Sequence, residues 1–334
     1  MRVLAVTNMY PTLALPTEGI FVEQQIKGLR QIGLEVEVVF LNRKQEGISV
    51  YRGLGRKIDS RIKHFEPDVV HIMYGGVMAD LVTRAVRNRP TVVTFHGSDL
   101  LGEHLSGFAR KMIAGHGVYS SWRAAWRANG VIVVSKILQE ALPKFVNRSK
   151  VRIIPCGIDF NRFQLLDRKV CLDRLGWDPN CFNILFNGNS ADPVKRPYLA
   201  RRTIDLLVNE LGIHAKLQEL RGVSNDEVPI WLNASDAVLL TSLHEGSPTV
   251  IKEALACDLP VVSVDVGDVR EQIQGIEGCY IALPTPADLA AKLALVYSGS
   301  SRVEGRQRMQ KLSVENIARC LAEFYQELLN SNLT

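Results

Sequence analysis

The sequence predicts an α/β protein built from two successive units of doubly wound parallel sheet. Short runs rich in β-branched residues alternate with longer amphipathic stretches, which is the pattern of strands and covering helices. The alternation breaks at IPCGIDFNRF (residues 154–163) and then starts again. A length of 334 residues also favours two domains. We therefore expect two Rossmann-like sheets that are joined near residue 157 and face one another across a cleft.

The individual elements follow from this periodicity in chain order. The first unit is expected to hold strands at residues 3–6, 36–41, 69–72, 92–95, 131–134 and 151–154, and helices near 19–32, 54–64, 76–88, 107–128 and 136–142. The second is expected to hold strands at 184–186, 217–220, 237–240, 261–264 and 280–282, helices near 195–209, 226–234, 248–257, 267–274 and 286–298, and a helical tail from about 302. The predicted domains are residues 1–157, residues 158–312, and a C-terminal helix at 313–334 that packs back toward the first domain.

The composition is that of a globular protein without a membrane span. Hydrophobic residues make up 46% and charged residues 22% of the chain, which allows a substantial core. The opening segment MRVLAVTNMY has the pattern of a strand rather than of a signal peptide. No apolar run approaches the roughly 20 residues of a membrane helix. These features predict a cytoplasmic protein.

Neither the cysteines nor the acidic residues support a bound metal. Six cysteines are present and no two form a CxxC pair, so the usual zinc and disulfide frameworks are not expected. The sequence also contains neither HExxH nor DxD. We expect reduced thiols, no metal and no resident cofactor.

Charge is distributed unevenly along the chain. Residues 1–158 hold 22 Lys and Arg against 12 Asp and Glu, a net charge of +10, whereas the remainder carries −5. A basic first half suggests an anionic partner. Because no nucleic-acid-binding motif is present, an acidic lipid surface or an anionic acceptor is expected rather than nucleic acid.

The segment EGSPTVIKE (residues 245–253) predicts a loop that turns into a helix. Ser247 is a good N-cap, and Pro248 fits the first helical position, where its missing N–H costs nothing. A helix start offers free N–H groups and a positive dipole end, so it attracts anions. Glu245 and Glu253 flank this start, and carboxylates accept hydrogen bonds from hydroxyl groups. A nucleotide sugar would use all these parts; a capped helix with two solvated glutamates is the alternative.

A second segment, NGNSADPVKRP (residues 187–197), follows a predicted strand and precedes a predicted helix. Gly188 allows a tight turn after the strand. Lys195 and Arg196 lie where the helix begins, and two cations there would neutralise a diphosphate without a metal ion. A basic pair on the protein surface is the alternative interpretation.

The first unit contributes TFHGSD (residues 94–99), which ends a predicted strand. His96 and Asp99 are expected to emerge at the carboxyl end of the sheet, where such folds bind ligands, so both are candidate catalytic residues. A structural histidine is the alternative. In the long loop after the first strand, Gly19 precedes a helix and would let the backbone approach a phosphate.

Together these segments resemble the retaining GT-B glycosyltransferases of family 4. The block EGSPTVIKEALACDLPVVSVDVGDVRE (residues 245–271) is similar to the family signature, in which seven residues separate two glutamates. The supporting segments, in the family's order, are HGSD (96–99), VIVVSK (131–136), IPCGID (154–159) and LNASDAVLLTSLHEG (232–246). The resemblance covers most of the chain and is greatest to enzymes of exopolysaccharide or teichuronic-acid assembly.

The resemblance, added to the segments above, implies a role for each candidate residue. The residues implied to act in catalysis are His96, Glu245 and Asp99, and those implied to contact the donor sugar are Glu245, Gly246, Ser247 and His96. The residues implied to bind the donor diphosphate are Lys195, Arg196, Gly19, Ser247, Thr249, Val250, Gly188 and Asn189. Those implied to bind ribose and base are Glu253, Arg221, Gly222 and Val223.

One position departs from the family pattern. The family usually places a second phosphate-binding arginine directly after the glycine that follows the first strand of the second domain, and this chain has Asn189 there. Asparagine can donate a hydrogen bond but brings no charge. We expect either that Arg196 compensates or that phosphate binding is weaker.

The resemblance implies transfer of a hexose-type unit from a UDP- or GDP-linked sugar to a hydroxyl acceptor, with the anomeric configuration retained. Negative charge grows on the leaving diphosphate, and Lys195, Arg196 and the helix start at Ser247 are placed to stabilise it. No side chain stands out as a covalent nucleophile, which favours a front-face route. A sugar-nucleotide epimerase and a non-catalytic nucleotide-sugar-binding protein are the alternatives.

The acceptor is expected to be a polysaccharide or lipid-linked precursor. Residues 107–130 combine aromatic residues with basic ones, namely Phe108, Trp122 and Trp126 with Arg110, Lys111, Arg123 and Arg127. This mixture suits a helix lying on an anionic membrane, here the inner face of the cell membrane. A helix buried against the first sheet, with its basic residues outside, is the alternative.

Overall fold

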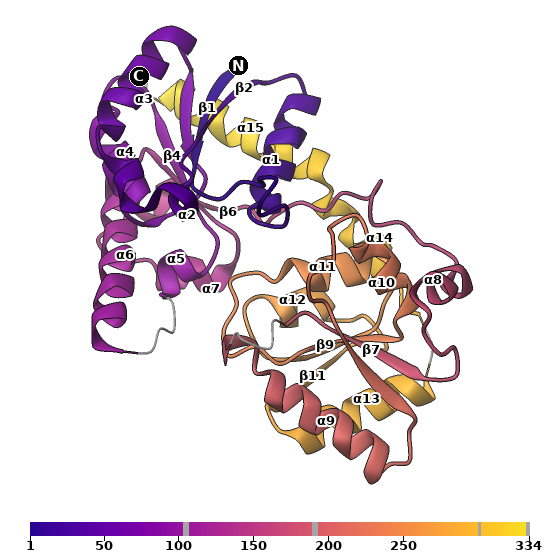
Figure 1. Ribbon diagram of the computed structural model, residues 1–334. Helices are drawn as coiled ribbons and strands as arrows, with labels where there is room; N and C mark the ends of the chain where they lie inside the picture. The colour runs from indigo at the N-terminus through magenta and orange to yellow at the C-terminus, as the bar shows by residue number, and fades with distance from the viewer. Residues whose placement is uncertain (103–106, 189–192, 300–301, 332–334) are drawn as a thin grey trace. The chain divides into compact units, whose positions relative to one another are not determined.

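The computed structural model describes residues 1–102, 107–188, 193–299 and 302–331. Contacts between Cα atoms divide the chain into two compact units (Figure 1). Unit 1 comprises Met1–Gly157 together with Val314–Thr334, and unit 2 comprises Ile158–Ser313. Each unit is built on one parallel sheet with flanking helices, which confirms the predicted fold class.

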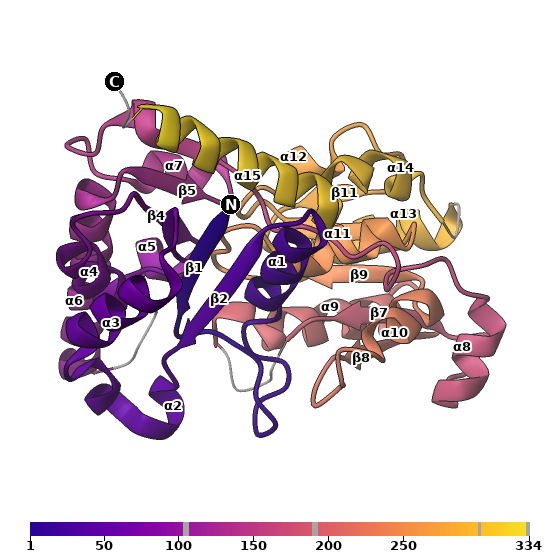
Figure 2. The same cartoon turned by 90° about the horizontal axis from the view of Figure 1, so that it is seen from above.

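Unit 1 contains a six-stranded parallel sheet in the order β2-β1-β3-β4-β5-β6. Its strands are β1 (Arg2–Thr7), β2 (Glu35–Phe40), β3 (Val69–Ile72), β4 (Thr91–Phe95), β5 (Gly130–Val133) and β6 (Val151–Ile153). Its helices are α1 (Ile20–Gln31), α2 (Arg43–Glu46), α3 (Leu54–Phe65), α4 (Gly76–Ala85), α5 (Ser98–Leu101), α6 (Phe108–Arg127), α7 (Lys136–Ala141) and α15 (Val314–Ser331), with 3₁₀ turns η1 (Gly47–Tyr51) and η2 (Arg148–Lys150). Helix α15 lies alongside α1 (Figure 2).

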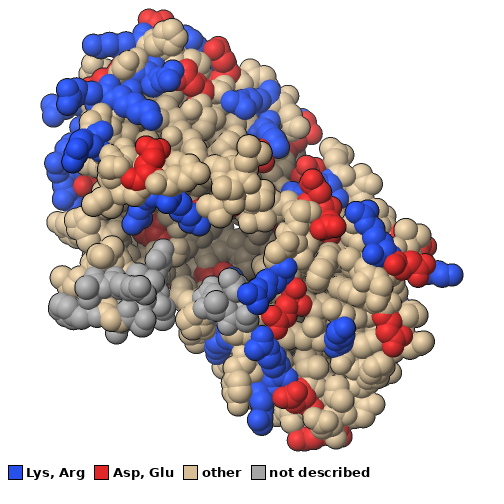
Figure 3. All heavy atoms as spheres, viewed as in Figure 1, with Lys and Arg blue, Asp and Glu red and all other residues tan. Residues whose placement is uncertain are grey.

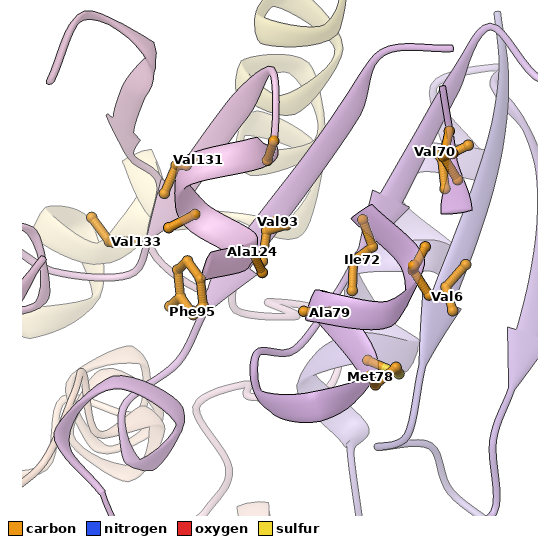
Figure 4. Packing of buried hydrophobic residues seen from close by; sticks show 14 of the residues in the cluster. Val6, Val70, Ile72, Met78, Ala79, Val93, Phe95, Ala124, Val131 and Val133 are labelled. Carbon is orange, nitrogen blue, oxygen red and sulfur yellow. The ribbon is translucent and has the colours of Figure 1, made fainter. Parts of the chain in front are cut away.

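The alternation of side chains along β3 decides which helices cover each face of the sheet in unit 1. Val70 and Ile72 belong to the hydrophobic cluster that includes Met78 of α4 (Figure 4). His71, between them, points the other way, where its Nδ1 lies 2.6 Å from the hydroxyl oxygen of Tyr325 on α15. The C-terminal helix therefore covers the face opposite α4.

Unit 2 contains a five-stranded parallel sheet in the order β11-β10-β9-β7-β8. Its strands are β7 (Phe182–Phe186), β8 (Ala215–Glu219), β9 (Ala237–Leu240), β10 (Val261–Val264) and β11 (Tyr280–Ala282). Its helices are α8 (Arg168–Leu175), α9 (Pro197–Asn209), α10 (Val228–Ala234), α11 (Thr249–Ala256), α12 (Val269–Ile273), α13 (Pro286–Ser298) and α14 (Gly305–Met309), with 3₁₀ turns η3 (Pro193–Lys195) and η4 (Gln310–Leu312).

Adjacent residues of β7 belong to different hydrophobic clusters. Ile184 packs in the cluster that contains Ile204 of α9 and Leu293 of α13. Leu185 packs in the cluster that contains Ile251 of α11. Both faces of the sheet are covered, which explains why this strand is apolar along its length.

Helices α2, α5 and α8 and the C-terminal tail differ from the sequence prediction. The sequence does not predict α8, because its residues RKVCLDRL bury only Cys171 and Leu172 and form no long apolar stripe. The prediction of one helical tail from about residue 302 is wrong. The C-terminal segment instead consists of α14, η4 and α15, and Ser313 in an extended conformation separates η4 from α15.

Candidate functional site

In unit 2, three candidate residues lie in loops that follow neighbouring strands. Strand β7 lies between β9 and β8, so the loops after these strands leave the sheet side by side at its carboxyl edge. The loop after β7 leads to Lys195, the loop after β8 carries Arg221, and the loop after β9 carries Glu245. The sheet thus brings together segments that are far apart in the sequence, at the edge where such folds bind ligands.

Two of the predicted residues are in direct contact. Lys195 Nζ lies 2.6 Å from Glu245 Oε1, and the two side chains are 24% and 15% exposed. Partial burial of this kind makes an ion pair stronger than one on the open surface. Within the described part of the chain, the Glu245 carboxylate makes no other hydrogen bond. Its second oxygen remains able to accept one.

Arg196 has a structural use that the sequence did not reveal. It precedes α9 with a left-handed φ of 50°. Its guanidinium donates hydrogen bonds to the carbonyl oxygens of Thr241 and Ser242. Burial lowers the pKa of Arg196. The side chain therefore fastens the loop after β9 to the start of α9.

The start of α11 differs from the prediction by one residue. Pro248, with φ −67° and ψ 116°, is the N-cap, and Thr249 is the first helical residue, so Ser247 is not the cap. The Ser247 hydroxyl instead donates a hydrogen bond to Asp268 Oδ2 at 2.7 Å. The N–H groups of the first turn, including those of Thr249 and Val250, have no acceptor further back in the helix.

Glu253 lies one turn further along α11. Burial raises the pKa of its carboxyl group to about 7, against the lowering influence of Arg162 and Lys252. Neither of these two cations was singled out from the sequence. The signal that would have pointed to Arg162 is the basic residue in IDFNRF, where the second unit begins.

The remaining candidates in unit 2 lie in turns. A Cβ added to Gly188 would lie 2.0 Å from the Phe186 ring, so this position requires glycine. Gly222, in the exposed turn beside Arg221, has a left-handed φ of 67°. Val223, which follows, is partly buried. Asn189 lies outside the described residues.

In unit 1, aromatic rings surround His96 at the carboxyl edge of the sheet. Its ring stacks on that of Tyr74, with centroids 6.0 Å apart and planes at 10°. The ring of Phe21 lies 4.4 Å away, centroid to centroid. His96 Nδ1 lies 3.6 Å from Cys156 Sγ. These neighbours come from α1 and from the segments after β3 and β6.

Backbone N–H groups hold the carboxylate of Asp99, a predicted catalytic residue, in place. Its carboxylate is buried and accepts hydrogen bonds from the N–H groups of Gly75, His96 and Gly97 at distances of 2.8 to 3.2 Å. Burial raises the pKa of Asp99 to about 6, while these donors lower it. The Asp99 carboxylate therefore joins the segment after β3 to the segment after β4 beside His96, and its part in catalysis stays a prediction.

Gly19 meets a steric requirement within its own loop. It has a left-handed φ of 68° directly before α1. A Cβ there would lie 2.3 Å from the carbonyl carbon of Met9 and 2.5 Å from the nitrogen of Tyr10. Gly19 therefore packs against the backbone of Met9 and Tyr10, and the predicted approach to a phosphate stays a prediction.

A cavity of about 390 Å³ opens beside the His96 segment in unit 1. Tyr51, Tyr74, Ser98 and His116 are among its lining residues. The hydroxyl groups of Tyr74 and Ser98 lie 2.9 Å apart. Aromatic surfaces with a few convergent polar groups are typical of small-molecule pockets.

Thiols and carboxylates do not gather into a metal site in the part of the chain that the structure describes. No three His, Cys, Asp or Glu side chains there are placed to hold a metal ion. The cysteines are free thiols, and Cys156, Cys171, Cys181 and Cys257 are buried. Among the described helices, none is both long and apolar enough to cross a bilayer.

The sequence of this chain is similar to those of known glycosyltransferases. The Glycosyltransferase Family 4 model matches residues 18–162, and the model for glycosyl transferases group 1 matches residues 200–313. The putative teichuronic acid biosynthesis glycosyltransferase TuaC of Bacillus subtilis is 28% identical over 333 residues, which cover 80% of this chain and 82% of the relative. A D-inositol 3-phosphate glycosyltransferase of Geodermatophilus obscurus is 28% identical over 178 residues, 43% of this chain and 39% of that relative.

Solved structures share the fold over the whole chain. Sucrose-phosphate synthase from Thermosynechococcus elongatus has a TM-score of 0.78 at 16% identity, covering 99% of this chain and 100% of its own. HepE from Anabaena in complex with UDP has a TM-score of 0.70 at 18% identity, covering 98% and 100%. Identities this low concern the fold alone. The two family models show that this chain belongs to the family 4 glycosyltransferases, and the solved structures show that it has a GT-B fold.

Proposed function

We propose that this glycosyltransferase moves a hexose-type sugar from a UDP- or GDP-linked donor to a hydroxyl group, with the anomeric configuration retained. The observation that carries the proposal is the partly buried ion pair of Lys195 and Glu245 beside the start of α11. A cation, an acidic acceptor and free helix N–H groups are the three parts that a sugar diphosphate requires. Structures of Anabaena HepE with UDP and with UDP-glucose share the fold and support this choice of donor.

In the proposed mechanism, the diphosphate lies against the N–H groups of Thr249 and Val250. Lys195 exchanges part of its contact with Glu245 for the phosphate oxygens and stabilises the charge that develops as the sugar–oxygen bond breaks. Glu245 accepts hydrogen bonds from the hydroxyl groups of the sugar. The departing phosphate takes the proton of the attacking hydroxyl on the same face. No metal ion and no covalent nucleophile take part.

The proposed acceptor is a polysaccharide or lipid-linked precursor, as the relative from Bacillus subtilis suggests. Helix α6 gives partial support to a membrane contact. Arg123 and Arg127 pair with Asp80 of α4, which favours a helix packed on the domain, yet Met112 and Ile113 are each 62% exposed. The side chains of Phe108, Arg110 and Lys111 lie outside the described residues. Lys and Arg side chains also gather over α3 and α4 (Figure 3).

Product analysis tests the reaction. The protein is incubated with UDP- and GDP-hexoses, with and without a polyprenyl-diphosphate-linked sugar, and the products are identified by mass spectrometry and by the anomeric coupling constants in NMR. We expect an extended acceptor with a retained anomeric centre and one free nucleoside diphosphate per transfer. A free epimerised sugar nucleotide, formed without acceptor, would instead indicate an epimerase, whose fold is also similar (TM-score 0.61 for UDP-GlcNAc 2-epimerase from Methanocaldococcus jannaschii).

A flotation assay tests the membrane contact separately. Liposomes that contain an anionic phospholipid should carry the protein upward in a density gradient at low salt, and neutral liposomes should not. If the protein stays at the bottom with both, the membrane contact is wrong while the transfer reaction stands.

A further inference from the structure

The loop that carries Glu245 rests against the loop that follows β10. Asp268 accepts a hydrogen bond from the Ser247 hydroxyl at 2.7 Å. Beside it, Gly267 has a left-handed φ of 56°, and a Cβ there would lie 3.1 Å from the Gly246 carbonyl oxygen and 3.2 Å from that of Glu245. The two loops are thus joined by one side-chain hydrogen bond and by close backbone contact.

Asp268 has a second hydrogen-bonding neighbour on α12. Its Oδ1 accepts a hydrogen bond from Gln272 Nε2. Each carboxylate oxygen therefore has a donor, and the carboxylate bridges the donor loop at Ser247 and the helix at Gln272. A bridge of this kind holds best when the carboxylate is ionised, because a charged acceptor makes the stronger hydrogen bonds.

Lys252 lies in the first turn of α11 and is fully buried, with an exposed fraction of 0%. Its Nζ has no hydrogen-bond partner among the described residues. The positive end of the helix dipole disfavours a cation in this turn. A buried ammonium is costly unless a negative charge compensates it. The position of Lys252 therefore calls for an acidic neighbour.

Two carboxyl groups feel the charge of Lys252. For Asp268, Lys252 is the strongest of the influences that lower the pKa against the effect of burial. For Glu253, the first such influence is Arg162 and Lys252 comes second.

We propose that Asp268 is a positioning residue for the donor site: its carboxylate holds Ser247 and with it the loop that presents Glu245, and the buried charge of Lys252 favours the ionised form of that carboxylate. The proposal rests on the proposed function, because it assigns the donor nucleotide to this loop. A loop that is already ordered costs less conformational entropy when the ligand binds. Loss of either charged group should therefore weaken nucleotide binding without removing any residue that touches the nucleotide.

Isothermal titration calorimetry with UDP, and with GDP, tests this on the full-length protein. Asp268→Ala and Lys252→Met should each raise the Kd about tenfold, a typical coupling within one polar network. The double variant Lys252→Met/Asp268→Asn removes both charges but keeps an oxygen acceptor for Ser247. It should bind within about threefold of the wild-type affinity, and so rescue the single change at Lys252. Asp265→Ala, in the same loop but exposed and paired with Arg270, is the matched control and should bind as wild type.

Steady-state kinetics distinguish a role in donor binding from a general loss of stability. The donor KM should rise in both single variants while kcat at saturating donor stays within about twofold, because the reacting groups are untouched. Thermal unfolding confirms that each variant is folded. If Asp268→Ala does not fold, Ser247→Ala removes the same hydrogen bond from the other side and should raise the Kd in the same way.

Three results would overturn the proposal. The first is an unchanged Kd in folded Lys252→Met and Asp268→Ala. The second is a double variant that binds no better than Lys252→Met alone, since removing the charge of Asp268 as well would then give no rescue. The third is wild-type protein that binds neither nucleotide, which would overturn the proposed function as well and is therefore distinguishable from the first two.

Discussion

Unit 1 and unit 2 share a parallel sheet with helices on both faces, yet they hold their polar loop residues in different ways. At the edge of unit 2, charged side chains pair with one another, as Lys195 does with Glu245. At the edge of unit 1, the carboxylate of Asp99 accepts hydrogen bonds from three backbone N–H groups. The ring of His96 lies beside the aromatic rings of Phe21 and Tyr74. At the carboxyl edge of its sheet, unit 2 therefore exposes paired charged side chains, whereas unit 1 exposes aromatic rings.

The two units also differ in where their ionisable groups with shifted pKa values lie. In unit 1, His71 is fully buried between Thr94 and Tyr325, and burial lowers its pKa to about 3. In unit 2, burial raises the pKa of Glu253 to about 7. The first group is held neutral at the core, where it fixes α15 to the sheet. The second lies in the candidate site, on helix α11. The following predictions test this contrast.

The largest effect is expected from Glu245→Gln in unit 2. The change keeps the shape but removes the charge that pairs with Lys195, and the rate of transfer should fall by about 100- to 1000-fold, as for the loss of one preorganised polar group. The rate is measured by the release of nucleoside diphosphate. Glu210→Gln, in the exposed turn after α9, is the control and should keep the wild-type rate. A wild-type rate in Glu245→Gln would remove this residue from the site.

The pH dependence of stability should report on His71 in unit 1. Because its pKa in the folded protein lies below the unfolded value of 6.5, the unfolded chain takes up a proton first as the pH falls from 6.5 toward 3. This group should therefore lower the free energy of unfolding by about 1.4 kcal/mol per pH unit in that window. Urea unfolding of wild type and His71→Gln should show profiles that converge as the pH falls. Parallel profiles would contradict a neutral buried histidine.

Gly19→Ala should destabilise unit 1 by about 2 kcal/mol, because it combines left-handed backbone strain with a clash against Met9. Gly33→Ala is the matched control, since Gly33 also has a left-handed φ but nothing within 4 Å of an added Cβ. It should cost about 1 kcal/mol, the strain alone. Unfolding is followed by tryptophan fluorescence. Equal losses in the two variants would show that contact with Met9 adds nothing.

A second effect of protonation on stability is expected from Glu253→Gln in unit 2. The folded pKa of Glu253 is raised, so the unfolded chain loses its proton first as the pH rises from 4.5 toward 7. Wild type should therefore lose stability relative to the variant as the pH rises through this window. This trend is opposite in sign to that of His71. Urea unfolding at pH 4.5 and pH 7.5 measures the free energy of unfolding of both proteins. If the difference between wild type and variant is the same at both pH values, the pKa of Glu253 is not raised in the folded protein.

The fold was largely predictable because strands buried on both faces appear in the sequence as short, continuous apolar runs. Residues 69–72 and 237–240 were predicted with the bounds that β3 and β9 have. Short or weakly amphipathic helices were missed, as α8 shows. The start of α11 was misplaced by one residue because Ser247, an ordinary N-cap by type, is held by Asp268 instead. That partner lies 21 residues away, beyond the reach of local rules.

The candidate site was predictable where it is contiguous and not where it is assembled. The segment from 245 to 253 carries its own signal, so Glu245 and Glu253 were found from the sequence. The contact between Lys195 and Glu245 spans 50 residues and depends on the strand order β9-β7-β8. The direction of the Asp99 carboxylate depends on Gly75, from a different loop. Neither follows from periodicity or residue type.

The most direct measurement is a crystal structure of this protein with the nucleoside diphosphate that binds most tightly. The account predicts diphosphate oxygens within hydrogen-bond distance of the N–H groups of Thr249 and Val250, with Lys195 Nζ moved from Glu245 toward the phosphate. A nucleotide bound elsewhere, with Lys195 still paired to Glu245, would contradict it.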